Sequence, residues 1–263
     1  MDLYGGQHWS VIRSLPADGR EAGLEVQLWV ASAGYGLWNC NWSAHAYSAT
    51  FTGKSEDAVA PAGKSGQAER QAWWEALSQG EHRPKKTPRS LAELVENNRN
   101  AVLMIVAPST YVDAMEPDLV RASQLGHSQQ KLFVISSDSP LQTGPLGAHW
   151  IKCPGALVFA LGGGVASLYA RVARHVLLEA RRTGLELSAV RERVAELSRK
   201  TGGWPENLRS PVTDGEVLQF IRNELEENPR QSRSGLLQRF RNSGQKCQME
   251  RFNRLYDTQR KAP

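Results

Sequence analysis

Cysteine is scarce in this sequence, and the scarcity excludes two ways of stabilising a fold. The three cysteines, Cys40, Cys153 and Cys247, are odd in number and lie far apart in the chain. Neither a disulfide framework nor a four-ligand zinc site fits that pattern. An apolar run of membrane-spanning length and a basic-then-apolar start are also missing. These absences predict a protein of the reducing cytoplasm that holds no metal and has no membrane partner.

Nucleotide-binding loops are missing as well. Gly-Lys-Ser occurs twice in one predicted loop, but Ser48 and Ala58 stand where a phosphate loop needs its first glycine. Gly162, Gly164 and Ser167 follow the dinucleotide-binding spacing, with serine in place of the final glycine. We therefore expect neither an NTPase nor a dinucleotide-binding protein, and we expect no cofactor.

Charge is spread unevenly along the chain of 263 residues. Residues 1–163 hold 13 Lys and Arg against 15 Asp and Glu, a net charge of 13 − 15 = −2. Residues 164–263 hold the remaining 19 against 12, a net charge of 19 − 12 = +7. Segregated positive charge predicts a polyanionic partner, usually nucleic acid. The alternative is a solvated basic surface without a partner.

Four short apolar runs are typical of strands, and helix patterns lie between them. Because the runs do not alternate, the strands are expected to be buried on both faces. The sequence therefore predicts an α/β fold with a mostly parallel central sheet flanked by helices. The predicted strands are residues 24–32, 101–108, 131–137 and 156–162, and the predicted helices are 90–98, 109–126 and 164–180.

Three details of the helix patterns can be checked. Ser90 is an expected N-cap, with Glu93 three residues later as in a capping box. Pro117 is expected to kink or split the helix that contains it. The third helix should bury one apolar stripe, formed by Val165, Leu168, Val172 and Val176.

After Gly184 the chain continues as short, basic helices. We predict an α/β domain over residues 1–184, which carries the active site, and a basic helical module over 185–263. The module is expected to be of the helix-turn-helix or winged-helix type and to bind DNA around the turn at 242–247. A dimerisation or lid element is the alternative. The expected phosphate contacts are Arg239, Arg241, Lys246, Arg251 and Arg254.

Three glycines precede the predicted helix 164–180. Glycines at a helix start allow backbone N–H groups to approach an anion. The alternative is that they let a helix pack closely on the sheet. The expected phosphate-binding residues here are Gly163, Gly164, Ser167, Arg171 and Arg174.

The stretch from Leu28 to Phe51 crowds aromatic and polar side chains just past a predicted strand. Ligands of open parallel sheets bind beyond the carboxyl ends of strands, so these groups are expected to line a base-binding pocket. Cys40 is the candidate nucleophile, and His45 and Tyr35 are the candidate acid–base groups; each has a structural role as its alternative. The groups expected to stack on a base or to bind its edges are Ser32, Trp38, Asn39, Asn41, Trp42, Tyr47 and Ser48.

Two motifs in this stretch resemble those of the YaaA-like proteins. "SAGYGL" (32–37) follows a strand, and "AYSATF" (46–51) matches the Tyr-Ser/Asp-x-x-Phe/Leu segment that comes next in that family. "DLYGGQHW" (2–9) and "GGGVASLYARVARH" (162–175) resemble its early and late segments. The resemblance implies a YaaA-like α/β domain with Tyr4, His8 and Gly34 among the substrate-binding residues. One departure is that family members usually carry a Cys-Ser-x-x-Lys-like segment before the Leu-Tyr, whereas this chain starts inside the pattern.

The basic tail with "SGQKCQMERF" (243–252) resembles members found beside DNA-modification systems. That resemblance implies hydration of the nitrile of cyano-deazaguanine, already inserted in DNA, to the amido form. It also implies double-stranded DNA carrying a modified base, and other proteins of a DNA-modification system, as partners. Two alternatives stay open: a non-catalytic YaaA-like DNA-binding protein, and a hydrolase or transferase acting on free modified nucleobases.

Overall fold

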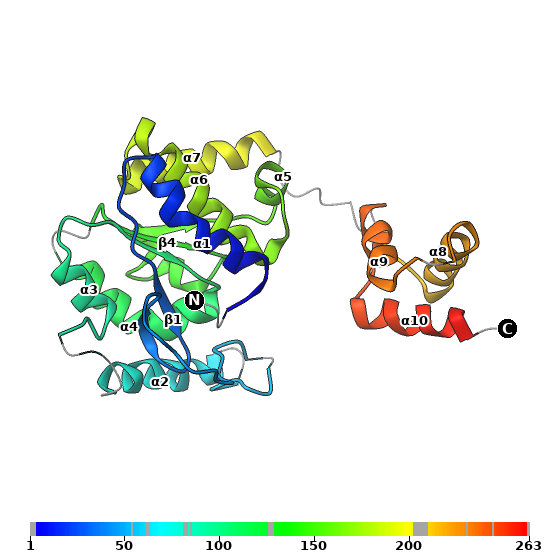
Figure 1. The fold of residues 1–263 in the computed structure, drawn as a ribbon, viewed down its shortest axis with the longest axis horizontal. Coiled ribbons are helices and arrows are strands. Elements are labelled where there is room, and N and C mark those ends of the chain that lie inside the picture. The colour runs from blue at the N-terminus through cyan, green and yellow to red at the C-terminus, as the bar shows by residue number, and fades with distance from the viewer. Residues whose placement is uncertain are drawn as a thin grey trace. The chain divides into compact units, whose positions relative to one another are not determined.

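The chain forms two compact units, Met1–Gly203 and Trp204–Pro263, each with its own hydrophobic core (Figure 1). The structure is a computed structural model. It describes residues 4–53, 55–61, 64–80, 84, 86–125, 129–201, 210–229, 231–243 and 245–261.

The first unit is an α/β structure built on a three-stranded parallel sheet in the order β3-β4-β5. Along β4, Leu132 and Val134 join the core on one face, and Phe133 and Ile135 join the core on the other. Both faces are therefore covered, as the unbroken apolar run predicts. The strands are β3 (Leu103–Val106), β4 (Leu132–Ser136) and β5 (Trp150–Lys152).

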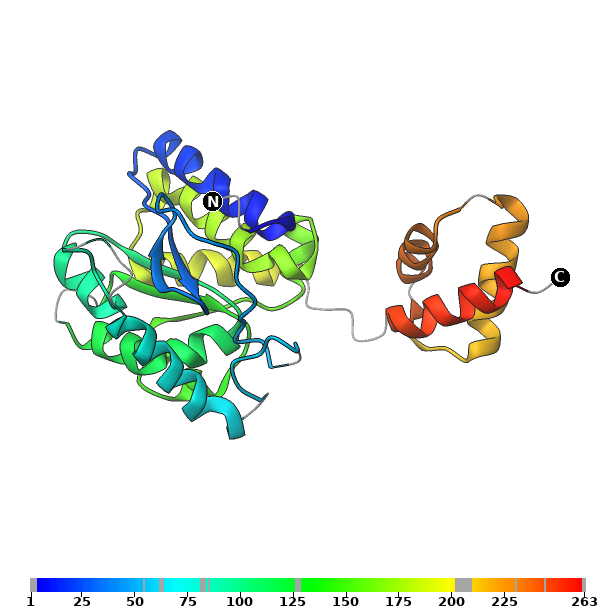
Figure 2. The ribbon, with the colours of Figure 1, turned by 60° about the horizontal axis from the view of Figure 1, so that its bottom comes forward.

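Helices form a layer on each side of this sheet (Figures 1 and 2). The helices α3 (Leu91–Asn97) and α4 (Ser109–Gln124) cover one face, with α2 (Gln67–Gln79) packed against α4. The other face is covered by α5 (Leu157–Leu161), α6 (Leu168–Thr183) and α7 (Leu187–Thr201), and α1 (Gly6–Glu21) packs against α6.

The predicted strands 101–108 and 131–137 are confirmed, but the strand predicted at 156–162 is wrong. That segment forms α5, whose start is a turn in which the Leu157 N–H donates to Pro154 O at 3.0 Å. A short apolar run has too few residues for its periodicity to separate helix from strand. The third strand is β5, whose three residues are too few to register as an apolar run.

The strand predicted at 24–32 forms only over β1 (Trp29–Ser32). It pairs antiparallel with β2 (Gly36–Asn39), so Ser32 lies opposite Gly36 across a tight turn. Gly36 adopts a φ of +69°, which favours glycine. This hairpin is a separate two-stranded sheet. The expectation that the Leu28–Phe51 stretch begins at the carboxyl end of a parallel strand is therefore wrong.

Pro117 lies inside α4 without splitting it. Proline has no N–H, so the carbonyl of Asp113, four residues earlier, loses its helical donor. Gln71 Nε2 on α2 donates to that carbonyl at 3.2 Å instead. The tertiary contact satisfies the exposed acceptor, which explains why the helix continues through the proline.

The N-cap of α3 is confirmed, because Ser90 Oγ accepts the Glu93 N–H at 3.1 Å. The Glu93 carboxylate reaches back one residue further than a capping box requires and accepts the Arg89 N–H at 2.7 Å. In the helix predicted at 164–180, the apolar stripe is buried from Leu168 onward, whereas Val165 is 54% exposed in a preceding 3-10 turn.

The boundary between the units differs from the predicted one at residue 184. Leu187, Val190 and Val194 of α7 pack into the same core as β4, so α7 belongs to the first unit. Residues 164–203 hold 8 Lys and Arg against 4 Asp and Glu, and residues 204–263 hold 11 against 8. The net charges are +4 and +3, so more than half of the basic excess lies outside the second unit.

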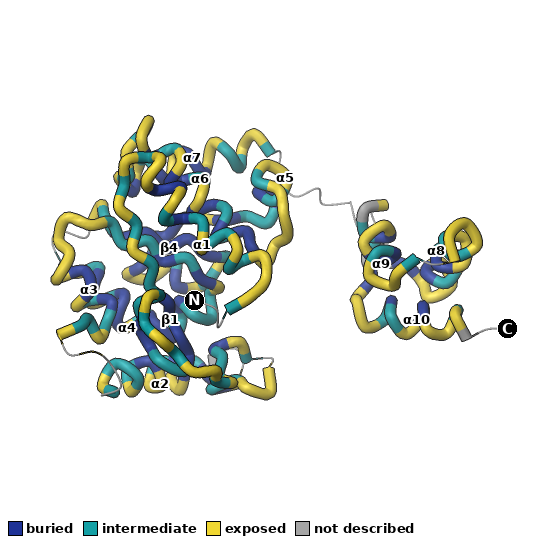
Figure 3. Tube along the Cα trace, in the orientation of Figure 1, coloured by how far each residue is buried: buried dark blue, intermediate teal, exposed yellow. Residues whose placement is uncertain are grey.

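The second unit consists of three short helices around one core, and Figure 3 shows buried residues on their facing sides. Thr213 and Glu216 form a capping box at the start of α8, with the Thr213 N–H donating to Glu216 Oε2 at 2.7 Å. The helices predicted here are confirmed. The elements are β6 (Ser210–Pro211), α8 (Asp214–Glu227), α9 (Arg233–Asn242), β7 (Gln245–Lys246, parallel to β6) and α10 (Met249–Lys261).

Candidate active site

Three hydroxyl groups from separate parts of the first unit form a chain of hydrogen bonds. Ser32 ends β1, Tyr47 follows the hairpin, and Tyr4 precedes α1. Ser32 Oγ lies 2.7 Å from the Tyr47 hydroxyl, which lies 2.8 Å from the Tyr4 hydroxyl. The structure thus brings together three of the residues predicted to bind the substrate.

The direction of the protons follows from two backbone groups on Ser32. In the hairpin turn, the N–H groups of Gly34 and Tyr35 donate to Ser32 Oγ at 3.2 and 3.1 Å. These bonds occupy both lone pairs of the hydroxyl, so Ser32 donates its own proton to Tyr47. We assign the Tyr47 proton to its bond with Tyr4, because Ser32 already donates to Tyr47. Within the described residues, the Tyr4 proton meets no further acceptor.

The packing around Tyr47 keeps it protonated. Burial raises the pKa of Tyr47, as does its bond to Tyr4, while the bond from Ser32 acts in the opposite direction. Gly34 makes the close approach possible, because a Cβ at this position would lie 2.7 Å from the Tyr47 ring. Tyr47 is therefore a proton donor at neutral pH, as the chain requires.

Aromatic rings surround the hairpin turn. The Tyr35 ring centroid lies 4.7 Å from that of Trp38 and 5.5 Å from that of Tyr47. Trp73 of α2 donates its Nε1–H to Ala33 O at 2.7 Å and remains 43% exposed. Trp73 therefore presents a fixed aromatic surface beside the turn. Its position could not be predicted from the sequence, because Trp73 lies on a helix 40 residues along the chain from Ala33.

Cys40 and His45 do not meet. Cys40 follows β2, whereas Tyr35, whose hydroxyl contacts His45, precedes β2. The Cys40 and Tyr35 backbones are therefore on the order of 15 Å apart along the strand. The Cys40 thiol is close to Asn41 Oδ1, at 3.5 Å, and burial raises its pKa. The His45 side chain is exposed, and its backbone N–H donates to the Tyr35 hydroxyl at 3.0 Å. In the described structure no hydrogen bond joins the Cys40 thiol to the His45 imidazole.

The remaining polar residues of the stretch lie outside the hydroxyl chain. Asn39 Oδ1 accepts the Asn41 N–H at 3.0 Å, which fixes the turn after β2. Trp42 packs edge-on against Trp38, with ring centroids 5.1 Å apart. Ser48 is exposed.

The start of α1 connects the hydroxyl chain to the glycine-rich loop. His8, four residues after Tyr4, is hydrogen-bonded to the backbone of Ala166. Burial lowers the pKa of His8, so its imidazole is neutral at pH 7. Gln7 lies next to Gly164. The start of α1 and the glycine-rich loop before α6, which the sequence predicts as separate sites, are thus adjacent.

Arg171 occupies the space that the glycines leave. A Cβ on Gly163, whose φ is +74°, would clash with the Arg171 guanidinium. Arg171 Nε donates to Ser167 Oγ at 3.1 Å, and Ser167 is fully buried while donating to Gly164 O at 3.0 Å. Ser167 is therefore not open to a phosphate. Arg171 meets no carboxylate in the described part of the chain, so it is the cation of this loop.

Arg174 does not stand free for a phosphate. Its Nε and Nη2 donate to the two carboxylate oxygens of Asp18 at 2.9 and 3.0 Å, and Ser14 Oγ donates to the same carboxylate at 2.7 Å. Asp18 is only 6% exposed. This pair joins α1 to α6 and engages two of the Arg174 donors, while phosphate binding by Arg174 stays a prediction.

In the second unit, two of the predicted DNA contacts are paired with acids. Arg239 lies 2.9 Å from Glu224, and Arg251 Nε donates to Asp214 at 2.6 Å. Arg241 donates to Cys247 O at 3.1 Å. Arg254 is exposed, and among the residues described in this unit no carboxylate pairs with it. The Lys246 side chain lies outside the described part.

No protein-family model, curated protein or solved structure matches the chain. Across the described ranges, no helix combines the length and the apolar character needed to cross a membrane. The same residues contain no group of three or more His, Cys, Asp or Glu side chains placed to hold a metal ion.

Proposed function

We propose that the chain is a DNA base-modification enzyme that adds water to the nitrile of cyano-deazaguanine in DNA and forms the amide. The observation that supports this reaction type best is the Tyr4 hydroxyl, which ends the hydrogen-bond chain and, with the proton direction assigned above, has no acceptor for its own proton among the described residues. The choice of base comes from the sequence motifs shared with YaaA-like proteins, and within them with the deazaguanine DNA-modification protein DpdC.

Nitrile hydration requires one nucleophile and one proton donor. Water attacks the nitrile carbon and loses a proton to a base, while the nitrile nitrogen gains a proton; the resulting imidic acid rearranges to the amide. Tyr4 supplies the proton to the nitrile nitrogen and is reprotonated from solvent, to which His45 releases the proton that it accepts; the bond from Tyr47 stabilises the phenolate left meanwhile on Tyr4. In this proposal His45 accepts the proton of the attacking water, since the residue is exposed and its backbone N–H bonds to the Tyr35 hydroxyl.

A route through a thioimidate on Cys40 is disfavoured by position and by protonation. Cys40 lies at the far end of β2 from the hydroxyl chain, and its raised pKa leaves little thiolate. Direct addition of water is therefore the mechanism that we propose.

Aromatic side chains provide the surface for the base. A base in duplex DNA must leave the stack before its nitrile can be reached. The exposed ring of Trp73 and the ring of Tyr35, both at the hairpin turn, suit stacking on the extruded base. The second unit, with a net charge of 11 − 8 = +3, holds the phosphate backbone in this proposal.

Mass spectrometry of nucleosides tests this function. Duplex DNA that contains cyano-deazaguanine is incubated with the full chain, digested and compared with a heat-inactivated control. The expected product is a nucleoside heavier by one water. Binding of the duplex without this product would instead support a non-catalytic DNA-binding protein.

The pairing of Arg239 and Arg251 with acids favours a second candidate, an enzyme acting on the free modified base. In that case the free nucleobase is converted, and the chain does not shift duplex DNA in a gel even at low salt. Conversion of the base only within DNA would exclude this candidate.

A further inference from the structure

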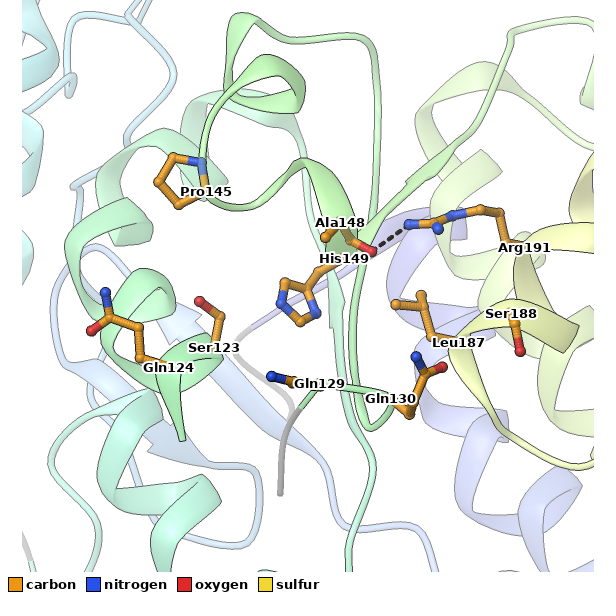
Figure 4. A pocket seen from close by; sticks show the side chains of 10 residues that line it. All are labelled: Ser123, Gln124, Gln129, Gln130, Pro145, Ala148, His149, Leu187, Ser188 and Arg191. Atoms are coloured by element: carbon orange, nitrogen blue, oxygen red, sulfur yellow. Dashed lines mark hydrogen bonds between the residues drawn. The ribbon is translucent and has the colours of Figure 1, made fainter. Parts of the chain in front are cut away.

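A cavity of about 480 Å³ lies at the edge of the sheet where β4 and β5 begin (Figure 4). The hydroxyl-chain site lies toward the start of α4, where Tyr111 is 3.2 Å from Thr50. The cavity contacts the opposite end of α4, at Ser123, roughly 20 Å away along a helix of this length. The two sites are therefore separate.

His149 presents a bare nitrogen to this cavity. The residue is 6% exposed, and its Nδ1 lies 3.2 Å from Leu132 O. A carbonyl oxygen can only accept, so Nδ1 carries the proton and Nε2 is an acceptor. Burial and the neighbouring Arg191 both lower the pKa of His149, which keeps the imidazole neutral. Figure 4 shows the ring pointing between Ser123 and Leu187.

Arg191 provides the positive charge. Its Nη2 donates to Ala148 O and, at 3.3 Å, to Trp150 O, the carbonyls that flank His149 in the chain. Both partners are neutral, and the described structure gives Arg191 no carboxylate. The donors Nε and Nη1 are not used by these bonds. The Arg191 guanidinium and the neutral His149 acceptor therefore line the same cavity.

The lining selects the class of ligand. Its described residues include no acidic side chain, which would oppose an anion, and no Phe, Tyr or Trp ring to stack on a base. Half of the ten lining residues carry an amide or a hydroxyl group, so a small polar ligand finds hydrogen-bond partners here. The lining residues are Ser123, Gln124, Gln129, Gln130, Pro145, Ala148, His149, Leu187, Ser188 and Arg191.

We propose that this cavity binds a small anion that carries a hydroxyl group. The anionic end, a phosphate or a carboxylate, bonds to Arg191 and to Ser188 at the start of α7. The hydroxyl group donates to His149 Nε2. A neutral polyol leaves the Arg191 charge unused, and a simple anion leaves the His149 acceptor unused. This proposal does not depend on the reaction assigned to the hydroxyl chain.

Calorimetric titration of the full chain tests the site with four probes: glycerol 3-phosphate, glycerate, glycerol and sulfate, an anion that has no proton to donate at pH 7. One of the first two should bind at least about tenfold more tightly than either of the last two, because it alone makes both contacts. Which of the two binds separates a phosphate ligand from a carboxylate. Equal affinity for sulfate would overturn the proposal, as would no heat from any probe at millimolar concentration.

Two variants locate the binding. Arg191→Gln should weaken binding of the preferred probe by about tenfold or more, since a charge-assisted bond is lost. Arg199→Gln is the matched control on the same helix, where Arg199 pairs with Glu192 at 2.6 Å outside the cavity. Melting temperatures check that both variants fold. Equal affinities of the two folded variants for the preferred probe would refute the site. If Arg191→Gln does not fold, the preferred probe is titrated into isotope-labelled parent protein, and amide chemical-shift changes that centre on Tyr35 would refute the site instead.

Discussion

Ser32 Oγ donates a hydrogen bond to the Tyr47 hydroxyl across 2.7 Å, although the two residues lie 15 positions apart in the chain. The bond exists because the hairpin turn supplies two N–H groups to Ser32 and because Gly34 has no side chain to keep the Tyr47 ring away. Local turn chemistry therefore fixes the direction of the whole hydroxyl chain.

Replacing Tyr47 by Phe should lower the free energy of unfolding by roughly 1–3 kcal/mol, because the Ser32 donor loses its buried partner. Urea denaturation measures this. Tyr169→Phe is the control, since the Tyr169 hydroxyl makes no hydrogen bond within the described part of the chain. Equal stability of the two variants would show that the Ser32–Tyr47 bond contributes nothing.

Replacing Cys40 by Ala should leave turnover within about twofold of the parent. The thiol lies away from Tyr35 and its raised pKa keeps it protonated. For the same reason its reaction with a disulfide reagent at pH 8 should be slower than that of a free cysteine. Loss of nearly all activity in this variant, with an unchanged melting temperature, would return the mechanism to a thioimidate.

Arg174→Gln should reduce stability at pH 7 and flatten its dependence on pH in acid. The bond from Arg174 holds the pKa of Asp18 below its ordinary value of 3.8. The stabilisation is therefore complete above that value, and it is lost as the pH falls through the lower pKa of the folded state. Unfolding free energies at pH 7, 4 and 3 measure the effect.

Arg182→Gln is the control for this pair, because Arg182 forms an exposed ion pair with Glu179 within α6. Exposed pairs contribute little, so the control should resemble the parent. If both variants show the parent's acid profile, the Asp18–Arg174 pair does not join α1 to α6 as described.

The two kinds of arginine in the second unit should behave differently. Arg254→Gln should weaken DNA binding and make the slope of affinity against salt shallower by about one. Arg251→Gln should mainly lower stability, because Arg251 bonds to Asp214 and, at 2.8 Å, to Val212 O. Gel shifts at several salt concentrations distinguish the two. Equal losses of affinity in both variants would indicate that the Arg251–Asp214 pair opens on DNA.

Local patterns in the sequence predicted the elements that local physics decides. The apolar runs at β3 and β4, the Ser90 cap and the helices of the second unit follow from periodicity and capping. The continuity of α4 through Pro117 could not be predicted, because it depends on Gln71 from another helix. For the same reason the sequence did not show that α7 packs on β4.

For the candidate site, the sequence indicated residues that the fold brings together, but it did not indicate their hydrogen-bond partners. Ser32, Tyr47 and Tyr4 meet as the motif suggests, but their order as donors depends on the turn geometry. Arg174 was predicted to bind phosphate because its partner Asp18 lies 156 residues away and no spacing rule links the two. Residue type alone cannot separate a free cation from a paired one.

Turnover of Tyr4→Phe in the nucleoside assay tests the central claim most directly. The substitution removes only the oxygen and proton that end the hydroxyl chain, and it leaves the ring that stacks on Trp9 at 4.4 Å. We predict a loss of roughly one hundredfold to ten thousandfold in turnover, with the melting temperature and duplex affinity close to those of Tyr169→Phe. Full formation of the amide by a folded Tyr4→Phe variant would contradict the account.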